Sequence, residues 1–296
     1  MDDNEWLADR FEEHRARLRA VAYRMLGSLT EADDAVQDTW LRLSRSGADE
    51  VDNLGGWLTT IVARVCLNVL RSRNTRREES FGVHVPDPIV SPEGMQPDAH
   101  ALLADSVGLA LLVVLDTLGP AERLAFVLHD MFQLPYEEIG PMVSRTPAAA
   151  RQLASRARRR VKGADLPAPD PDLSRQRDVV DAFFLAARGG DFDALVAVLD
   201  PDIVLRTDAG AGRPAASMVL HGASAVARQA LTGLRSIFTR PNTQVRPAVV
   251  NGAPGVVVAV GGQPMVVMGF TIAGKKIVEI DAIADPERVA RITSEV

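Results

Sequence analysis

Cysteine is nearly absent from this chain of 296 residues, which has a single one, Cys66. One cysteine excludes an internal disulfide framework and a cysteine-rich zinc site. Long apolar runs are missing too: Val107–Leu115 is among the longest, and roughly 18 apolar residues are needed to cross a bilayer. The N-terminal residues are acidic with no apolar stretch, so no secretory signal is expected. We therefore expect a reduced, cytoplasmic protein.

Aromatic residues are also scarce, at 5% of the chain, but hydrophobic residues make up 47% of it. This apolar fraction is sufficient for folded cores and excludes a globally disordered chain. A chain of 296 residues is too long for one ordinary core, so we expect two or three domains.

Positive charge is not in excess, because 33 Lys and Arg face 39 Asp and Glu, for a net charge of −6. Bulk charge therefore does not favour nucleic acid as a partner. The distribution does: residues 64–77 and 145–162 carry several arginines and no acid, whereas residues 87–138 hold nine carboxylates and one Lys or Arg, Arg123. A solvated helix face explains one basic stretch. Two such stretches in helical segments favour nucleic-acid binding.

Residues 136–160 predict a helix-turn-helix. A short helix from Tyr136 precedes a tight turn near Ser144, and Thr146 with Pro147 supplies the N-cap and first-turn proline of a second helix. Such a helix enters the major groove, where Arg reads guanine and Gln reads adenine. Its candidate base-reading residues are Arg151, Gln152, Ser155 and Arg156. Phosphate contacts are expected from Arg158, Arg159, Arg160 and Lys162. Packing is expected from Ala149, Leu153, Ala157 and Val161.

Two further helices are expected upstream. Helical periodicity gives one of them a buried stripe of Ala32, Ala35, Val36, Thr39, Trp40 and Leu43. Its opposite face carries Glu31, Asp34, Gln37, Asp38 and Leu41. The other helix opens at Trp57, which we interpret as a core residue, and becomes basic toward Arg71, where cations suit the helix dipole.

Proline and glycine mark two linkers, at 79–98 and 164–174. They leave helical segments at 1–78 and 99–163 and a third part at 175–296. The third part has helical patterns at 177–188, 192–199 and 223–238, and strand patterns at 203–205, 245–250, 256–260, 266–271 and 277–283. Between the last two strands, Ala273-Gly274-Lys275 predicts a hairpin turn. The predicted fold is therefore multidomain: two all-α domains, the second with the helix-turn-helix, followed by an α+β domain with a mostly antiparallel sheet.

Three motifs in this order resemble the group IV, or extracytoplasmic-function, bacterial sigma factors. Gly27–Leu43 is similar to the polymerase-binding helix of that family, Trp57–Arg71 to its −10 region, and Tyr136–Arg160 to its −35 helix-turn-helix. The resemblance implies that the chain directs core RNA polymerase to specific promoters for transcription initiation and is not an enzyme. We expect no cofactor, no metal site and no membrane partner.

The resemblance also implies roles for individual residues. Docking on the clamp helices of the largest catalytic subunit of the polymerase is implied for Asp34, Gln37, Asp38 and Leu41. Contacts with the −10 element are implied for Arg64, Asn68, Arg71 and Arg73. Contacts with the −35 element are implied for Arg151, Gln152, Ser155, Arg156 and Arg159. The flap of the other large subunit is the second implied polymerase contact, and the acidic linker at 79–98 is expected near the RNA path.

The C-terminal part has a resemblance of its own. Residues 165–169, 207–213 and 285–289 are similar to three motifs of the SigJ-like subgroup, in which a SnoaL-like domain, a cone of helices on a curved sheet, is fused to the sigma regions. The resemblance implies that this domain regulates the first two through Leu166, Pro167, Pro169, Asp208, Arg213, Asp285 and Arg288. A fused regulator makes a separate anti-sigma factor less necessary, and we expect none to be required.

Two other functions stay open at this point. The helix-turn-helix alone suffices for a stand-alone DNA-binding repressor, although the net charge of −6 and the acidic connector argue against it. The C-terminal domain also fits an enzyme or a small-ligand sensor, with candidate acid/base residues Asp202, Asp208, His221, Glu279 and Asp281. No spacing among these residues pairs a base with an orienting group, so we favour regulation.

Overall fold

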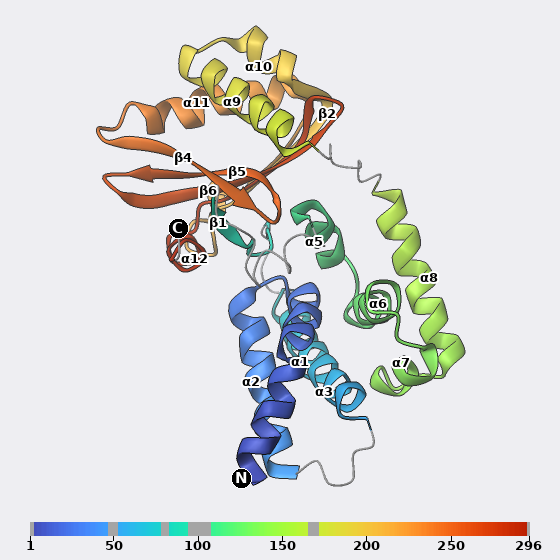
Figure 1. Ribbon diagram of the computed structural model, residues 1–296. Helices are drawn as coiled ribbons and strands as arrows, with labels where there is room; N and C mark the ends of the chain where they lie inside the picture. The colour runs from blue at the N-terminus through green and yellow to red at the C-terminus, as the bar shows by residue number, and fades with distance from the viewer. Residues whose placement is uncertain (1–2, 47–52, 78–82, 94–107, 165–171, 295–296) are drawn as a thin grey trace. The chain divides into compact units, whose positions relative to one another are not determined.

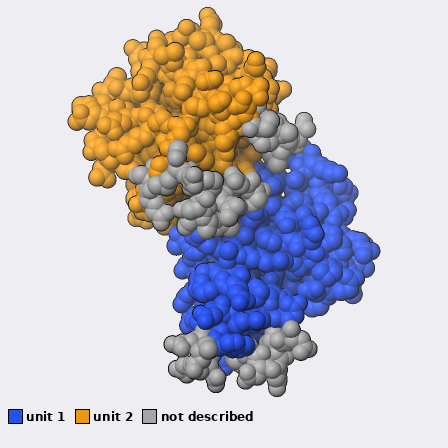
Figure 2. All heavy atoms as spheres, in the orientation of Figure 1, with its two compact units in different colours: residues 1–81, 111–165 blue, residues 82–110, 166–296 orange. Residues whose placement is uncertain are grey.

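The computed structural model describes residues 3–46, 53–77, 83–93, 108–164 and 172–294. The chain divides into two compact units (Figure 2): unit 1 comprises residues 1–81 and 111–165, and unit 2 comprises residues 82–110 and 166–296. Within the described residues, no helix combines the length and apolar character that crossing a membrane requires.

Unit 1 is built from helices in the part of it that the structure describes (Figure 1). In chain order they are α1 (Asp3–Leu26), α2 (Leu29–Ser46), α3 (Leu54–Arg77), α5 (Leu109–Asp116), α6 (Pro120–Phe126), the π-helical turn η1 (Val127–Met131), α7 (Tyr136–Met142) and α8 (Pro147–Gly163). The predicted stripe of α2 is confirmed, since Ala32, Val36 and Leu43 are fully buried between α1 and α3. Trp40 and Trp57 are half-buried, and the Trp40 ring lies 5.2 Å from that of Phe11.

Arg123 joins the two helical groups of unit 1, α1–α3 and α6–α8. Its side chain is 1% exposed, and its Nε donates a hydrogen bond of 3.1 Å to the backbone oxygen of Arg24 at the end of α1. Its Nη1 donates to Asp116 Oδ1 at 3.1 Å. The guanidinium of Arg24 in turn lies 5.2 Å from the Phe132 ring. A buried arginine needs partners for its charge. Arg123 finds one of them, the backbone oxygen of Arg24, in the other helical group, so the two groups are in direct contact.

Unit 2 is a seven-stranded sheet with the strand order β1-β4-β5-β6-β7-β2-β3. The strands are β1 (Val90–Pro92), β2 (Leu199–Asp208), β3 (Met218–His221), β4 (Thr243–Val250), β5 (Ala253–Val260), β6 (Gln263–Ala273) and β7 (Lys276–Ile283). All neighbours are antiparallel except β2 and β7. The helical elements are α9 (Leu173–Gly189), α10 (Phe192–Val198), the 3-10 turn η2 (Pro214–Ala216), α11 (Ala223–Phe238) and α12 (Pro286–Ile292).

Helices α9, α10 and α11 cover one face of this sheet (Figure 1) and form a single apolar core with it. Asp172 and Asp191 cap α9 and α10 by accepting hydrogen bonds from backbone N–H groups of the first turns. Two-residue hairpins join β4 to β7 in sequence order, and all six of their central residues have positive φ, as type I′ turns require. The last of them, Gly274-Lys275, is the hairpin turn that the sequence predicts.

The prediction of two all-α domains followed by an α+β cone is confirmed, but the structure has further elements that the predicted set lacks, among them β1, β3 and α12. Strand β3 and helix α12 are too short to give a periodic pattern. Strand β1 lies inside 79–98, which the prolines mark as a linker; Val90–Pro92 instead pair with β4 at the edge of the sheet. Proline is compatible with an edge strand because its missing N–H is not needed there.

Candidate nucleic-acid interface and regulatory cluster

The helix-turn-helix of α7 and α8 has the turn and the cap that the sequence predicts. Ser144 has a φ of 56° at the turn, and Thr146 Oγ1 accepts a hydrogen bond of 3.2 Å from Ala149 N, with Pro147 at the first helical position. Gly140 is required because a Cβ there would come within 2.8 Å of the backbone oxygen of Arg145. Pro141 lies in the last turn of α7, which keeps that helix short.

One side of α8 is exposed, although Arg151 lies 5.3 Å from the Tyr136 ring and Arg156 pairs with Glu122. The candidate −35 residues on this side, Arg151, Gln152, Ser155, Arg156 and Arg159, are all exposed. Of the four predicted packing residues Ala157 is buried, whereas Ala149, Leu153 and Val161 are only half-buried; Ala150 and Ala154 are buried instead. The reason is that α8 packs on both α6 and α7, and the alanines allow the closest approach to both.

Several arginines of α8 pair with acids of unit 1. Arg158 Nε donates to Asp130 Oδ1 at 2.5 Å, and its Nη2 to the Tyr136 hydroxyl at 2.6 Å; the hydrogen bond to Asp130 raises the pKa of Arg158. Glu122 accepts from Arg160 at 2.9 Å and forms an ion pair with Arg156 at 3.2 Å. Sequence reasoning missed Glu122 and Asp130, because no local pattern links residues that lie 28 or more positions from their partners.

Helix α3 presents an exposed row of polar residues, Arg64, Asn68 and Arg71, at i, i+4 and i+7. The fourth candidate for the −10 element, Arg73, differs. It is half-buried, donates a hydrogen bond of 2.9 Å to the backbone oxygen of Leu26 and pairs with Glu31. The structure thus brings three of the four candidates together and uses Arg73 to tie α3 to the α1–α2 turn.

The α2 face, which we define as Asp34, Gln37, Asp38 and Leu41, lies opposite the buried stripe. Asp34, Gln37 and Leu41 are exposed, and Leu41 exposes 42% of its surface although it is apolar. Asp38 is half-buried and accepts a hydrogen bond of 2.9 Å from Arg42, one turn away. An acidic face with an exposed leucine is suited to a basic protein partner.

In unit 2 the structure brings together residues from three distant parts of the chain. Arg288, on α12, donates from Nη1 to Asp208 Oδ2 at 2.5 Å and from Nε to Asp87 Oδ1 at 2.6 Å. Its Nη2 donates to the backbone oxygen of Val85, and the N–H of Val85 donates to Asp208 Oδ2 at 3.0 Å. We call Asp87, Asp208, Arg288 and the backbone of Val85 the Arg288 cluster. Its contribution from Val85 and Asp87 has no signal in the sequence.

Two further candidate regulatory residues, Asp285 and Arg213, lie next to the Arg288 cluster. Asp285 Oδ1 caps α12 by accepting 2.9 Å from the N–H of Arg288, which orients that arginine. Arg213 donates to the backbone oxygen of Ala284. Gly210 has a φ of 78°, and a Cβ on it would overlap the Asp285 carboxylate. The remaining candidates, Leu166, Pro167 and Pro169, lie outside the described residues.

The electrostatics of the Arg288 cluster favour the charged forms. Burial acts to raise the pKa of the Asp208 carboxyl, but hydrogen bonds from His84 and the Val85 N–H, together with the charge of Arg288, hold that pKa well below its usual range. Burial likewise acts to lower the pKa of Arg288, and the charges of Asp87 and Asp208 outweigh it and raise that pKa. The cluster is therefore a charged network held by mutual pairing.

The five candidate acid/base residues do not meet in the apolar core of unit 2. Ile280 and Ala282 face that core, so the alternating Glu279 and Asp281 point to the opposite face of the sheet. There both pair with Arg206, and burial raises the pKa of Asp281 to about 6. Asp208 belongs to the Arg288 cluster, and the remaining two, Asp202 and His221, are exposed.

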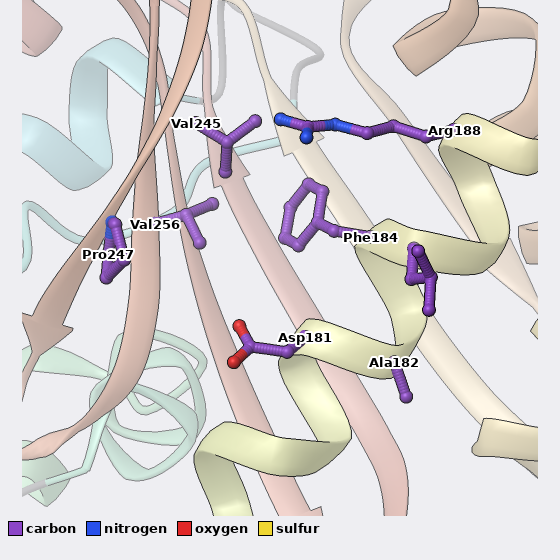
Figure 3. A pocket seen from close by; sticks show the side chains of 8 residues that line it. Asp181, Ala182, Phe184, Arg188, Val245, Pro247 and Val256 are labelled. Atoms are coloured by element: carbon purple, nitrogen blue, oxygen red, sulfur yellow. The ribbon is translucent and has the colours of Figure 1, made fainter.

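A pocket of about 550 Å³ opens between α9 and strands β4 and β5 (Figure 3). Phe184, Val245 and Val256 form its apolar wall, and Asp181 and Arg188 supply opposite charges from the same helix. None of the five candidate acid/base residues lines it. Among the described residues, no group of three or more His, Cys, Asp or Glu is arranged to hold a metal ion.

Comparison with known proteins identifies the two helical groups. The family of Sigma-70 region 2 matches residues 10–76, and that of Sigma-70 region 4 matches residues 108–161. The probable ECF RNA polymerase sigma factor SigI of Mycobacterium tuberculosis is 35% identical over 285 residues, which cover 95% of this chain and 94% of SigI. The chain belongs to the ECF RNA polymerase sigma factors.

Two further comparisons cover this sigma factor. SigJ of Mycobacterium tuberculosis is 39% identical over 220 residues, or 74% of this chain and 70% of SigJ. The crystal structure of that SigJ matches with a TM-score of 0.75 at 32% identity and covers 95% of this chain and 97% of the solved one. The sigma factor therefore shares the SigJ architecture, binds core RNA polymerase and promoter DNA, and acts in promoter-specific transcription initiation rather than in catalysis.

Proposed function

We propose that this sigma factor recognises its promoters through two separate surfaces of unit 1 and binds polymerase through a third. Its α8 side reads the −35 element with Arg151, Gln152, Ser155, Arg156 and Arg159. The exposed row of α3 contacts the −10 element with Arg64, Asn68 and Arg71, and Arg73 supports that row by fixing the end of α3. The observation that carries this proposal is the exposed side of α8, which itself contains no acidic residue. Helix α8 follows a helix-turn-helix turn whose geometry depends on Gly140 and Ser144.

The α2 face is the proposed docking surface for the clamp helices of the largest polymerase subunit, with region 4 docking on the flap of the other large subunit. Its acidic residues steer association with a basic surface, and the exposed Leu41 supplies apolar contact area. We propose further that unit 2 modulates this engagement and that no separate anti-sigma factor is required, because the chain carries its own regulatory domain.

Simultaneous contact with both elements requires unit 1 to open. The two elements lie about 25 base pairs apart, which is roughly 85 Å of B-DNA. In the structure, however, Arg123 Nε lies 3.1 Å from the backbone oxygen of Arg24, so the two helical groups touch. The described arrangement of unit 1 is therefore a closed one, and binding of polymerase supplies the free energy that separates the groups.

Run-off transcription with core RNA polymerase and a promoter library tests this function. Wild-type protein should give defined start sites, and the charge reversal D34K with D38K should abolish them by removing polymerase binding. The matched control D9K reverses an exposed acid on α1 that is not part of the α2 face, and it should leave transcription unchanged. Full activity of the D34K/D38K protein would contradict the assignment of the α2 face. Specific promoter binding without polymerase would instead favour a stand-alone repressor.

A further inference from the structure

Residues 83–93, from the stretch between the two sigma regions, are incorporated into unit 2 as an added edge strand. Val90, Ser91 and Pro92 pair antiparallel with Val250, Val249 and Ala248 of β4. Next to this ladder, Asn251 accepts a hydrogen bond of 2.7 Å on Oδ1 from the N–H of Ile89, and its own N–H donates to the Ile89 oxygen at 2.9 Å. The turn residue Asn251 thus extends the pairing beyond the strand.

Side chains recognise the same segment. Val85, Ile89 and Val90 are each at most 9% exposed, so the apolar side chains of the segment are buried. Asp87 is 8% exposed and bonds Arg288, while Glu93 accepts 2.8 Å from Arg177. Backbone pairing at a sheet edge combined with pockets and charges for alternate side chains is how domains bind extended peptides.

We propose that unit 2 is a peptide-binding module whose ligand is residues 83–93 of its own chain, so that the C-terminal domain is attached to the connector between regions 2 and 4 independently of the covalent linker at 165–171. This inference builds on the proposed function, because it places the regulator on the chain segment that joins the two promoter-reading regions. The Arg288 cluster then holds the segment on unit 2 through its ion pairs and hydrogen bonds, and it is neither a catalytic site nor a site for a separate ligand.

The connecting chain has different lengths on the two sides of the bound segment. From Arg77, the last residue of α3, the chain reaches Val83 in six residue steps, which span at most about 22 Å. From Glu93 it reaches Leu109, the first residue of α5, in 16 steps, which span at most about 58 Å. The chain between the bound segment and α3 is therefore much shorter than the chain between the bound segment and α5.

A nicked full-length protein tests the attachment directly. A site-specific protease sequence is placed within 165–171, the chain is cut, and the product is run on size exclusion at micromolar concentration. We expect the two fragments of the wild-type sequence to co-elute. With D87A and I89P, which remove the Arg288 partner and the N–H donated to Asn251, the fragments should separate or bind at least about tenfold more weakly. The control S91A changes a side chain of the same strand but keeps its backbone pairing.

All substitutions lie in the bound segment, so the sequences of strands β2 to β7 and of α12 stay intact in every variant. Hydrogen exchange on the uncut proteins gives a second readout: the Val85 and Ile89 amides should be protected in the wild type and S91A, and Val85 should lose protection in D87A/I89P. The proposal is overturned if the nicked wild type separates at once, or if the nicked D87A/I89P protein co-elutes as tightly as the wild type. Because no polymerase is present, either result leaves the assignment of the sigma surfaces untouched.

Discussion

The arginines of α8 and Arg288 in unit 2 both pair with carboxylates, but in different environments. Arg156 and Arg160 share Glu122 at the surface, and their side chains are about half exposed, at 54% and 51%. The Arg288 side chain is 15% exposed, and its partners Asp87 and Asp208 are 10% and 4% exposed. Exposed ion pairs contribute about 0–1 kcal/mol, and water or phosphate readily replaces them. Removing one partner of a buried pair costs about 3–5 kcal/mol. Arg156 and Arg160 can therefore leave Glu122 and bind DNA phosphate at little cost. The ion pairs of Arg288, in contrast, stay formed in folded unit 2.

The largest effect is expected from R288A. It leaves Asp87 and Asp208 buried without their common partner, so unit 2 should lose about 3–5 kcal/mol of unfolding free energy. The protein's three tryptophans, Trp6, Trp40 and Trp57, all lie in unit 1. In urea, the far-UV circular dichroism transition should therefore shift while the tryptophan fluorescence transition does not.

Arg291 provides the matched control for R288A. It pairs with the same Asp87 at 3.2 Å, but its side chain is 47% exposed. R291A should change the unfolding free energy by no more than about 1 kcal/mol. Equal losses in R288A and R291A would show that burial does not distinguish the two kinds of arginine.

A smaller effect is expected from titrating Asp208 alone. Its pKa is lowered in the folded protein, so its contribution to stability is complete above its unfolded pKa, about 3.9, and is lost as the pH falls through the folded value. The thermal midpoint of unit 2, followed by circular dichroism, should drop between pH 5 and progressively more acidic solutions. In D208N the thermal midpoint should fall less on acidification. If it falls as much as in the wild type, Asp208 does not cause the loss of stability in acid.

On the DNA side of the comparison, R151A should weaken binding by about 1–3 kcal/mol at one base position of the −35 element and relax the specificity there. Competition among single-base variants of a promoter, measured with holoenzyme, reports this loss. K162A, at the far end of α8, removes a predicted phosphate contact and should weaken all variants alike. If R151A weakens binding to all promoter variants equally, Arg151 contacts phosphate and does not read a base.

The smallest effect is expected from E122Q, which removes the acid shared by Arg156 and Arg160. Folding stability should change by less than about 1 kcal/mol, because both arginine partners are about half exposed, although Glu122 itself is 16% exposed. Promoter affinity of the holoenzyme should rise modestly, since the two arginines no longer exchange Glu122 for phosphate. A stability loss as large as that of R288A would contradict the contrast between the two environments.

Local patterns predicted much of what each region is. The α2 stripe, the Thr146 cap and the Gly274-Lys275 turn are decided by neighbouring residues, and all three are present in the structure. The exposed residues of α8 were also predicted, although only Ala157 of the four predicted packing residues is buried, because contacts with α6 and α7 set the packing side. The roles assigned to these residues remain predictions.

By itself the sequence determined the fold class, the order of the domains and the family, because periodicity, caps, turns and motifs are written in short stretches of chain. Only the tertiary structure decided where residues 83–93 go, and which acids meet the arginines of α8 and α12. Asp87 and Arg288 are 201 positions apart, and the Ile89 amide reaches Asn251 across 162. Edge-strand pairing and buried ion pairs depend on which surfaces the folded sheet leaves available, and no local pattern carries that information.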